Sequence, residues 1–239
     1  MLADRPVSGS LGSLAGLSPA ASVNAVVGFV EEQLSIFSDL YTTSKIKNEK
    51  GLTQELCSLL NRNSRKQGYP FWFEKEHMEE VERGESPQVD IAVIGDDTDQ
   101  EIDSKNYNNP KAFFSMEAKR LGRLPRVREK EYLVGRFEGG KYRDCGGVER
   151  FKKEIHGKGL QYAAMIGYVQ EHHFDHWFCA INSWIDDLID GTSPSNAHWS
   201  EKDKLTEIHR RPETARFSSV NARETGSITL YHLWVNLIL

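Results

Sequence analysis

Hydrophobic residues recur along the chain with two different periods. A spacing of three to four positions, which is that of an amphipathic helix, indicates four helices. They are expected over residues 23–40, 50–66, 148–155 and 174–188. Ser22 is the expected N-cap of the first helix, and Gly68 is expected to end the second.

Short apolar runs bounded by polar or glycine-rich segments indicate six strands. These cover residues 71–78, 89–95, 112–121, 163–170, 215–222 and 227–238. The order of elements predicts an α/β fold, in which a three-strand meander is followed by a crossover helix and a fourth strand. The central sheet is expected to be mixed and flanked by helices. Whether the last two strands extend this sheet or form an interface stays open.

The predicted elements divide the chain into three parts. Residues 1–22, rich in Ser, Gly, Ala and Pro, are expected to form a flexible tail without the apolar stretch of a signal peptide. Residues 23–190 are expected to form the core with its N-terminal helices, and 191–239 a linker, polar over 195–213, and a strand pair packed on the core. Two connections are long: a polar insertion at 96–110, and an extended basic loop with one helical turn at 122–147.

Composition and charge narrow the class of protein. A net charge of -5 argues mildly against a general nucleic-acid coating protein, and no apolar run is long enough to span a bilayer, so no membrane partner is expected. The three cysteines show no CxxC or CxxH spacing, which favours a reducing, cytoplasmic compartment. Residues 74–103 are strongly acidic and 119–143 strongly basic. This layout suits a metal beside a phosphate, although two solvated loops of opposite sign give the same pattern.

The strand predicted at 112–121 carries the most informative local pattern. Strand alternation places Glu117 and Lys119 side by side on one face, while Met116 and Ala118 fall on the other. Asp90 is the only charged residue of the strand before it, and it approaches Glu117 if the two strands pair antiparallel. Two neighbouring carboxylates repel each other, and a divalent cation such as Mg²⁺ removes that cost.

The arrangement Asp90 … Glu117-Ala118-Lys119 resembles the D-x(n)-E-x-K signature of the PD-(D/E)xK nuclease superfamily. The resemblance covers roughly residues 48–185 and implies a restriction-endonuclease-like core. It implies that Asp90, Glu117 and the carbonyl of Ala118 bind Mg²⁺, with Mn²⁺ as a substitute, and that Lys119 serves the nucleophilic water. The sequence departs from the pattern in having Val89 directly before Asp90, with the proline further back at position 87.

The resemblance also implies further site residues. Many members add an acidic residue on the helix before the meander; Glu55 is the candidate here, Glu49 is the runner-up, and a solvent-facing glutamate is the equal alternative for Glu55. The cations that are candidates for phosphate contacts are Arg120, Arg136, Lys141, Arg143, Arg150 and Lys152. The aromatic residues that can stack on bases, or simply anchor the loop, are Tyr132, Phe137 and Tyr142. Ordinary surface cations and core aromatics are the alternative for each of them.

A cluster of three histidines is a second candidate metal site. His172, His173 and His176 include an i, i+4 pair, but the sequence offers no third ligand. A surface cluster at the start of a helix is therefore favoured over a zinc site.

Three functions are compatible with these observations. The first is a Mg²⁺-dependent endonuclease, a phosphodiesterase acting on ester bonds of nucleic acid, with DNA favoured, in bacterial restriction or anti-phage defence. The second is a non-catalytic or conditionally activated nuclease-fold subunit of a multi-protein defence or DNA-processing complex. The third is an unrelated α/β binding domain in which the triad is a structural ion-pair network. For the first two, a protein partner or a homo-oligomer is expected, because no target-recognition domain is recognisable.

Overall fold

Two long helices open the part of the chain that the structure describes. The computed structural model describes residues 19–42, 46–79, 87–95, 100–102, 105–107, 112–122 and 124–238. Helix α1 (Pro19–Tyr41) begins earlier than predicted, so Ser22 is a buried residue inside it and not its N-cap. Residues 1–18 of the predicted tail lie outside the described residues. Helix α2 (Glu49–Gln67) begins after Asn48, whose side chain accepts the Gly51 N–H, and it ends at Gly68 as predicted.

A mixed seven-stranded sheet forms the centre of the molecule, in the order β1-β2-β5-β8-β11-β10-β9. Its strands are β1 (Phe71–Met78), β2 (Gln88–Gly95), β5 (Phe114–Leu121), β8 (Tyr162–Val169), β9 (Thr206–Arg210), β10 (Thr214–Arg223) and β11 (Gly226–Asn236). The first three pair antiparallel, as expected of a meander, whereas β8 is parallel to both β5 and β11. The predicted α/β class with a mixed, helix-flanked sheet is therefore confirmed.

The C-terminal strands extend this same sheet, which settles the question that the sequence left open. Strand β11 pairs with the whole length of β8, from Thr229 beside Tyr162 to Asn236 beside Val169. The polar stretch 195–213, predicted as a linker, contains the short helix η3 (Glu201–Asp203) and the edge strand β9. That prediction was wrong because an edge strand can be largely exposed and then lacks hydrophobic alternation.

The two predicted connections also contain regular structure. The segment 96–110 contains two short strands, β3 (Gln100–Ile102) and β4 (Lys105–Tyr107), which pair with each other. The segment 122–147 contains the 3-10 helix η2 (Arg126–Tyr132) and a hairpin of β6 (Arg136–Glu138) and β7 (Lys141–Arg143). The basic segment is therefore a folded subassembly and not an extended loop.

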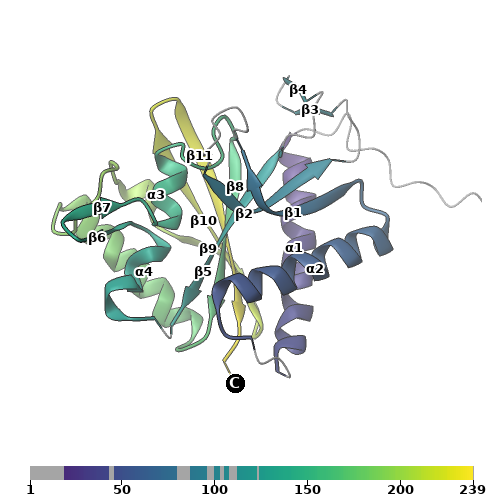
Figure 1. Cartoon of the computed structure of the whole chain (residues 1–239), viewed down its shortest axis with the longest axis horizontal. Helices are drawn as coiled ribbons and strands as arrows, with labels where there is room; N and C mark the ends of the chain where they lie inside the picture. Colours follow the sequence, from purple (N-terminus) through teal and green to yellow (C-terminus); the bar gives the residue numbers. More distant parts are fainter. Residues whose placement is uncertain are drawn as a thin grey trace, which may run out of the picture.

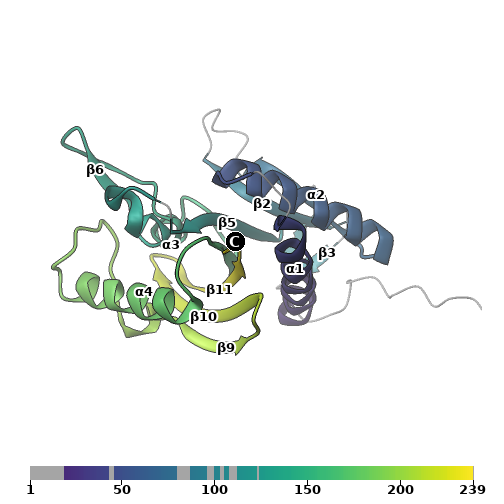
Figure 2. The same cartoon turned by 90° about the horizontal axis from the view of Figure 1, so that it is seen from below.

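The sheet lies between two groups of helices (Figure 1). Helices α1 and α2 cover one face; η2, α3 (Gly147–Lys152) and α4 (Phe174–Ile189) lie against the other, as the second view also shows (Figure 2). Strand β8, in the middle, is buried along seven of its eight residues. Within the described part of the chain, no helix is long and apolar enough to cross a membrane.

Gly167 of β8 permits the close packing of the sheet beside the charged residues of β5. It pairs with Lys119 on one side and with Trp234 of β11 on the other. The indole of Trp234 is completely buried and occupies the space where a side chain at position 167 would lie. Any Cβ there would overlap the ring, so the register of three central strands depends on this glycine.

We expect Gly167→Ala to lower the free energy of unfolding by about 1–3 kcal/mol, because the added methyl group overpacks the core against Trp234. Urea denaturation followed by circular dichroism measures the change. The matched control is Gly28→Ala: Gly28 lies exposed in α1 with open space around it, and alanine there should stabilise by about 0.5–1 kcal/mol. Equal effects of the two substitutions would contradict the role given to Trp234.

Candidate functional site

The antiparallel pairing of β2 with β5 brings Asp90 to Glu117. Ile91 pairs with Met116, and the ladder ends there, so the next position along places Asp90 opposite Glu117. The Asp90 carboxylate then takes the place of a ladder partner and accepts the Ala118 N–H at 2.8 Å. The two strands therefore separate at the point where the acidic residues meet.

Glu117 is a carboxylate buried in the middle of the molecule, with only 1% of its surface exposed. One of its oxygens accepts hydrogen bonds from Lys119 Nζ at 2.9 Å and from Arg150 Nη1 at 3.2 Å. The other, Oε2, has no hydrogen-bond partner among the described residues, although His156 Nε2 lies 3.5 Å away. Burial alone would raise the pKa of Glu117, but the neighbouring cations outweigh it and hold this pKa well below its usual range. Glu117 is therefore ionised at neutral pH, with one oxygen available.

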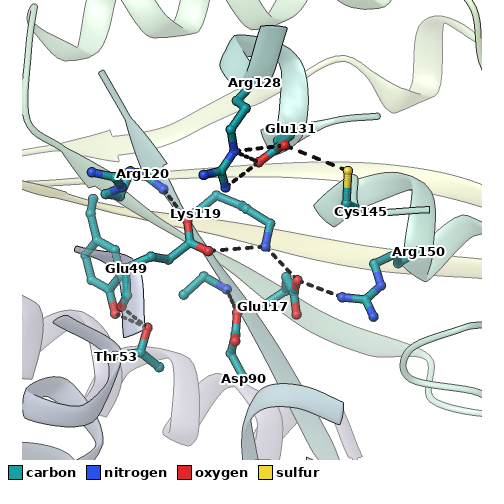
Figure 3. Close-up of polar contacts among 12 residues, drawn as sticks. Glu49, Thr53, Asp90, Glu117, Lys119, Arg120, Arg128, Glu131, Cys145 and Arg150 are labelled. Atoms are coloured by element: carbon teal, nitrogen blue, oxygen red, sulfur yellow. Dashed lines mark hydrogen bonds and ion pairs between the residues drawn. The ribbon is translucent and has the colours of Figure 1, made fainter. Parts of the chain in front are cut away.

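Lys119 occupies the centre of the acidic group, and its ammonium points between Glu49 and Glu117 (Figure 3). Its Nζ lies 3.6 Å from Glu49 Oε1 in addition to its bond to Glu117. Burial would lower the pKa of Lys119, but the surrounding carboxylates raise it above its ordinary value. Lys119 is therefore a permanent cation and hydrogen-bond donor in this environment, not a base.

The helix glutamate at the site is Glu49, the runner-up of the sequence analysis. As the first residue of α2 it reaches the end of β5, where it also accepts the Arg120 N–H at 3.2 Å. Glu55, the first choice, is exposed and lines a groove between α1 and α2 with Phe37 and Arg62. The structure does not bring Glu55 to the other acidic residues, because it follows Glu49 by more than one helical turn.

Asp90 is the carboxylate of the group whose negative charge is least well compensated. Its pKa is raised from 3.8 to about 7, first by burial and then by repulsion from Glu117. A proton or a divalent cation between these carboxylates removes the repulsion. Within a strand, the N–H and C=O of one residue point to the same edge, so the Ala118 carbonyl faces the side on which Asp90 lies.

Two further residues belong to the cluster and were not found from the sequence. His156 is completely buried between two carboxylates, with Nδ1 3.4 Å from Glu79 Oε2 and Nε2 facing Glu117. Glu79 accepts the Ser115 hydroxyl at 2.6 Å and the Gly157 N–H at 2.9 Å. Burial would raise the pKa of Glu79, but these donors and His156 lower it. Glu79 sits in a long acidic run and His156 in a turn, so no local pattern distinguishes either.

The cations proposed for phosphate binding fall into two groups. Arg150 lies at the site, and Arg120 lies beside Glu49 with its guanidinium on the Lys47 carbonyl. Lys141 and Arg143 are exposed on the hairpin of β6 and β7.

Two of the proposed cations are already engaged by acids. Arg136 is paired with Glu131, and Lys152 is buried against Asp203. Lys152 is thereby excluded as a phosphate contact, since its side chain is only 1% exposed. The partner acids lie on other elements, so the sequence could not show these pairs.

The three aromatic residues of the basic segment have different environments. Tyr132 is buried and bonded to His232, so it cannot stack on a base. Tyr142 donates its hydroxyl to Glu149 at 2.6 Å, while Phe137 is 61% exposed. Of the three, Phe137 alone is open for stacking.

A divalent cation with a preference for oxygen fits the residues present. Asp90 and Glu117 supply carboxylates, Glu117 Oε2 has no hydrogen-bond partner in the described structure, and the Ala118 carbonyl faces the same edge. In the described residues, no three Asp, Glu, His or Cys side chains are arranged to hold a metal, and this includes the His172–His176 pair. Mg²⁺ needs only one or two carboxylates because it keeps waters and binds phosphate oxygens, whereas a structural zinc site needs four ligands.

No protein-family model matches the chain, and neither a curated protein nor a solved structure is significantly similar to it. The function therefore has to be inferred from the geometry and chemistry of the cluster around Glu117.

Proposed function

We propose that this protein is a Mg²⁺-dependent nuclease with a restriction-endonuclease-like core, acting on phosphodiester bonds of DNA in the cytoplasm, in restriction or anti-phage defence. One observation carries the proposal: adjacent strands bring Asp90 together with Glu117-Ala118-Lys119, and the ammonium of Lys119, whose side chain is only 12% exposed, lies among the carboxylates. The motif resemblance supports the same chemistry, and the mixed sheet has the meander and crossover that the resemblance implies.

Each residue of the cluster has a role that its environment allows. Asp90, Glu117 and the Ala118 carbonyl would hold Mg²⁺, which when bound polarises the scissile phosphate and lowers the pKa of a bound water. Lys119, a fixed cation, orients that water and stabilises negative charge that develops on the phosphate. Arg150 and Glu49 position the reacting groups, since they contact Glu117 and Lys119 respectively.

An unsatisfied carboxylate oxygen and a raised pKa favour a metal site over a purely structural ion-pair network. Four carboxylates gather here, those of Glu49, Glu79, Asp90 and Glu117. The cations facing them are Lys119, Arg150, Arg223, which interacts with Glu79, and, if protonated, His156. A network that served stability alone would be expected to balance its buried charges and satisfy every oxygen. The Glu117 oxygen without a hydrogen-bond partner in the described structure and the raised pKa of Asp90 support a cation in this position.

A conditionally active subunit remains the second candidate, and the pairing of Lys119 favours it. The ammonium is engaged by Glu117 at 2.9 Å and by Glu49 at 3.6 Å. A partner protein or a substrate that draws Glu49 away would free this lysine for the reaction. In that case the isolated chain is inactive and cleaves only when its partner is supplied.

For the catalytic role of the cluster we expect Asp90→Asn and Lys119→Met each to lower the rate of DNA cleavage in Mg²⁺ by on the order of 100-fold or more. Gel assays with linear duplex and single-stranded DNA measure the rate, and circular dichroism confirms that each variant is folded. Two isosteric changes on α2 form a matched pair. Glu49→Gln should alter the rate because it contacts Lys119, whereas Glu55→Gln should leave it unchanged because it is exposed elsewhere.

Wild-type rates in Lys119→Met would remove this lysine from the mechanism. If the wild-type protein cleaves neither DNA nor RNA in Mg²⁺ or Mn²⁺, the assay is repeated with its genomic neighbours. Cleavage that appears only then identifies the conditionally active subunit, and none in either case contradicts a nuclease.

The raised pKa of Asp90 predicts an unusual dependence of stability on pH. Between pH 3.8 and 7 the folded protein keeps a proton on Asp90 that the unfolded chain releases, so this group's contribution to stability is present at low pH and is lost as the pH rises. In EDTA, stability should therefore fall from pH 5 to pH 8 by about 1–3 kcal/mol more in the wild type than in Asp90→Asn. Urea denaturation at the two pH values measures the difference.

Added Mg²⁺ supplies the independent readout. It should stabilise the wild type more at pH 8 than at pH 5, because the ion and the proton compete for the same carboxylates. The Asp90→Asn variant should show a smaller gain. Equal stabilisation of both proteins by Mg²⁺ would place the ion elsewhere.

A further inference from the structure

The hairpin of β6 and β7, here called the arm and comprising residues 136–143, projects at the edge of the molecule opposite the C-terminal end of α2 (Figure 2). Its turn consists of Gly139 and Gly140, with φ of 59° and 77°. Positive φ at both central residues is the geometry of a type I′ turn, which matches the twist of a two-stranded hairpin. The arm is thus a regular hairpin with a short turn.

The base of the arm, where its two strands leave the body of the protein, is hydrogen-bonded to helix α3. Glu149 of α3 accepts the Gly135 N–H at 2.9 Å and the Tyr142 hydroxyl at 2.6 Å through one oxygen. At Gly135 and at Gly146 the backbone of the facing segment lies so close that a Cβ would overlap it. These contacts hold both strands of the arm in place where they leave the body of the protein.

The two faces of the arm carry different exposed groups, an aromatic ring on one and two cations on the other. Phe137 is 61% exposed and rests edge-on against Tyr142, with ring centroids 5.3 Å apart. Phe137 pairs with Tyr142 in the hairpin, so strand alternation places Lys141 and Arg143, which are both exposed, on the opposite face. Arg143 lies 3.9 Å from Glu138 on that face, a contact too long and too exposed to neutralise it firmly. The hairpin therefore offers a stacking surface on one face and phosphate-binding charge on the other.

The arm is connected to the candidate site through two consecutive residues. Glu149 holds the arm, and the next residue, Arg150, bonds Glu117 at 3.2 Å. Both residues sit on the same six-residue helix, so the arm and the Glu117 carboxylate are anchored to one element.

We propose that the arm binds a single-stranded part of the DNA substrate, with an unpaired base stacked on Phe137 on one face and the phosphates that pass around the edge of the hairpin on Lys141 and Arg143 of the other face. A single strand can bend around a two-stranded hairpin, whereas a stiff duplex cannot. This inference rests on the proposed nuclease function and adds the class of substrate. An aromatic face binds any base that is unstacked, whereas the bases of an intact duplex are covered by their neighbours. Phe137 is the single exposed large apolar side chain of the arm, which is too little apolar surface for a membrane or a hydrophobic protein interface.

Binding is tested in EDTA, where no metal-dependent cleavage occurs. Fluorescence anisotropy is measured with a labelled oligothymidylate and with a blunt duplex of equal length. We expect Phe137→Ala to weaken binding of the oligothymidylate by roughly 5- to 150-fold, with little effect on the duplex, and Phe137→Trp to restore it. Lys141→Ala with Arg143→Ala should weaken binding and reduce its dependence on salt.

The matched controls are two substitutions outside the arm, one on β9 and one on α2. Ile208→Ala removes an exposed apolar side chain from β9, and Lys66→Ala removes an exposed cation from the last turn of α2. Both should bind the oligothymidylate as the wild type does. Unchanged binding in Phe137→Ala, equal losses for both DNA forms, or no binding of single strands by the wild type would overturn the proposal.

The failure of this inference differs from the failure of the proposed function. If the arm is not a substrate contact, Phe137→Ala cleaves single-stranded DNA in Mg²⁺ at the wild-type rate. If the protein is not a nuclease but the arm binds single strands, cleavage is absent while the Phe137-dependent binding persists.

Discussion

The burial of the Glu117 carboxylate in the central strand β5 is the constraint on which the arrangement of this protein depends. A buried charge without partners costs several kcal/mol, so elements must be placed where they can compensate it. Lys119 comes from the same strand, Arg150 from α3, and His156 from the turn after α3. These partners satisfy one oxygen of Glu117 and leave the other, which faces His156, without a hydrogen-bond partner in the described structure.

Helix α3 connects this centre to the rest of the basic segment. It has only six residues and would not be stable alone, since most helical stability at such lengths comes from tertiary contacts. Three charged residues fix it in three directions: Glu149 toward the arm, Arg150 toward Glu117, and Lys152 toward the buried Asp203 of η3. The segment that the chain places between β5 and β8 is thereby held at the edge of the cluster around Glu117.

This packing determines which cations of the basic segment are paired with acids and which remain exposed. Two cations that face the protein interior, Arg136 and Lys152, form structural ion pairs with Glu131 and Asp203. Lys141 and Arg143, which follow the turn of the hairpin, remain exposed because no helix or strand of the described structure packs over them. The distinction between a structural cation and one free to bind phosphate is therefore a matter of what packs against it and not of residue type.

The sequence by itself determined the elements whose pattern is local. Strand alternation isolated Glu117 and Lys119 on one face of β5, and the lone charge in β2 marked Asp90, because a period of two is set by the backbone alone. Only the tertiary structure decided which glutamate of α2 reaches the site, since Glu49 and Glu55 both lie on a regular helix and the packing of that helix on the sheet chooses between them. The same holds for His156 and Glu79, which meet Glu117 through contacts between distant segments, and for the edge strand β9, whose exposed residues carry no hydrophobic period. A pattern within one helix or strand can be recognised from the sequence, whereas a site assembled from several elements depends on how those elements pack.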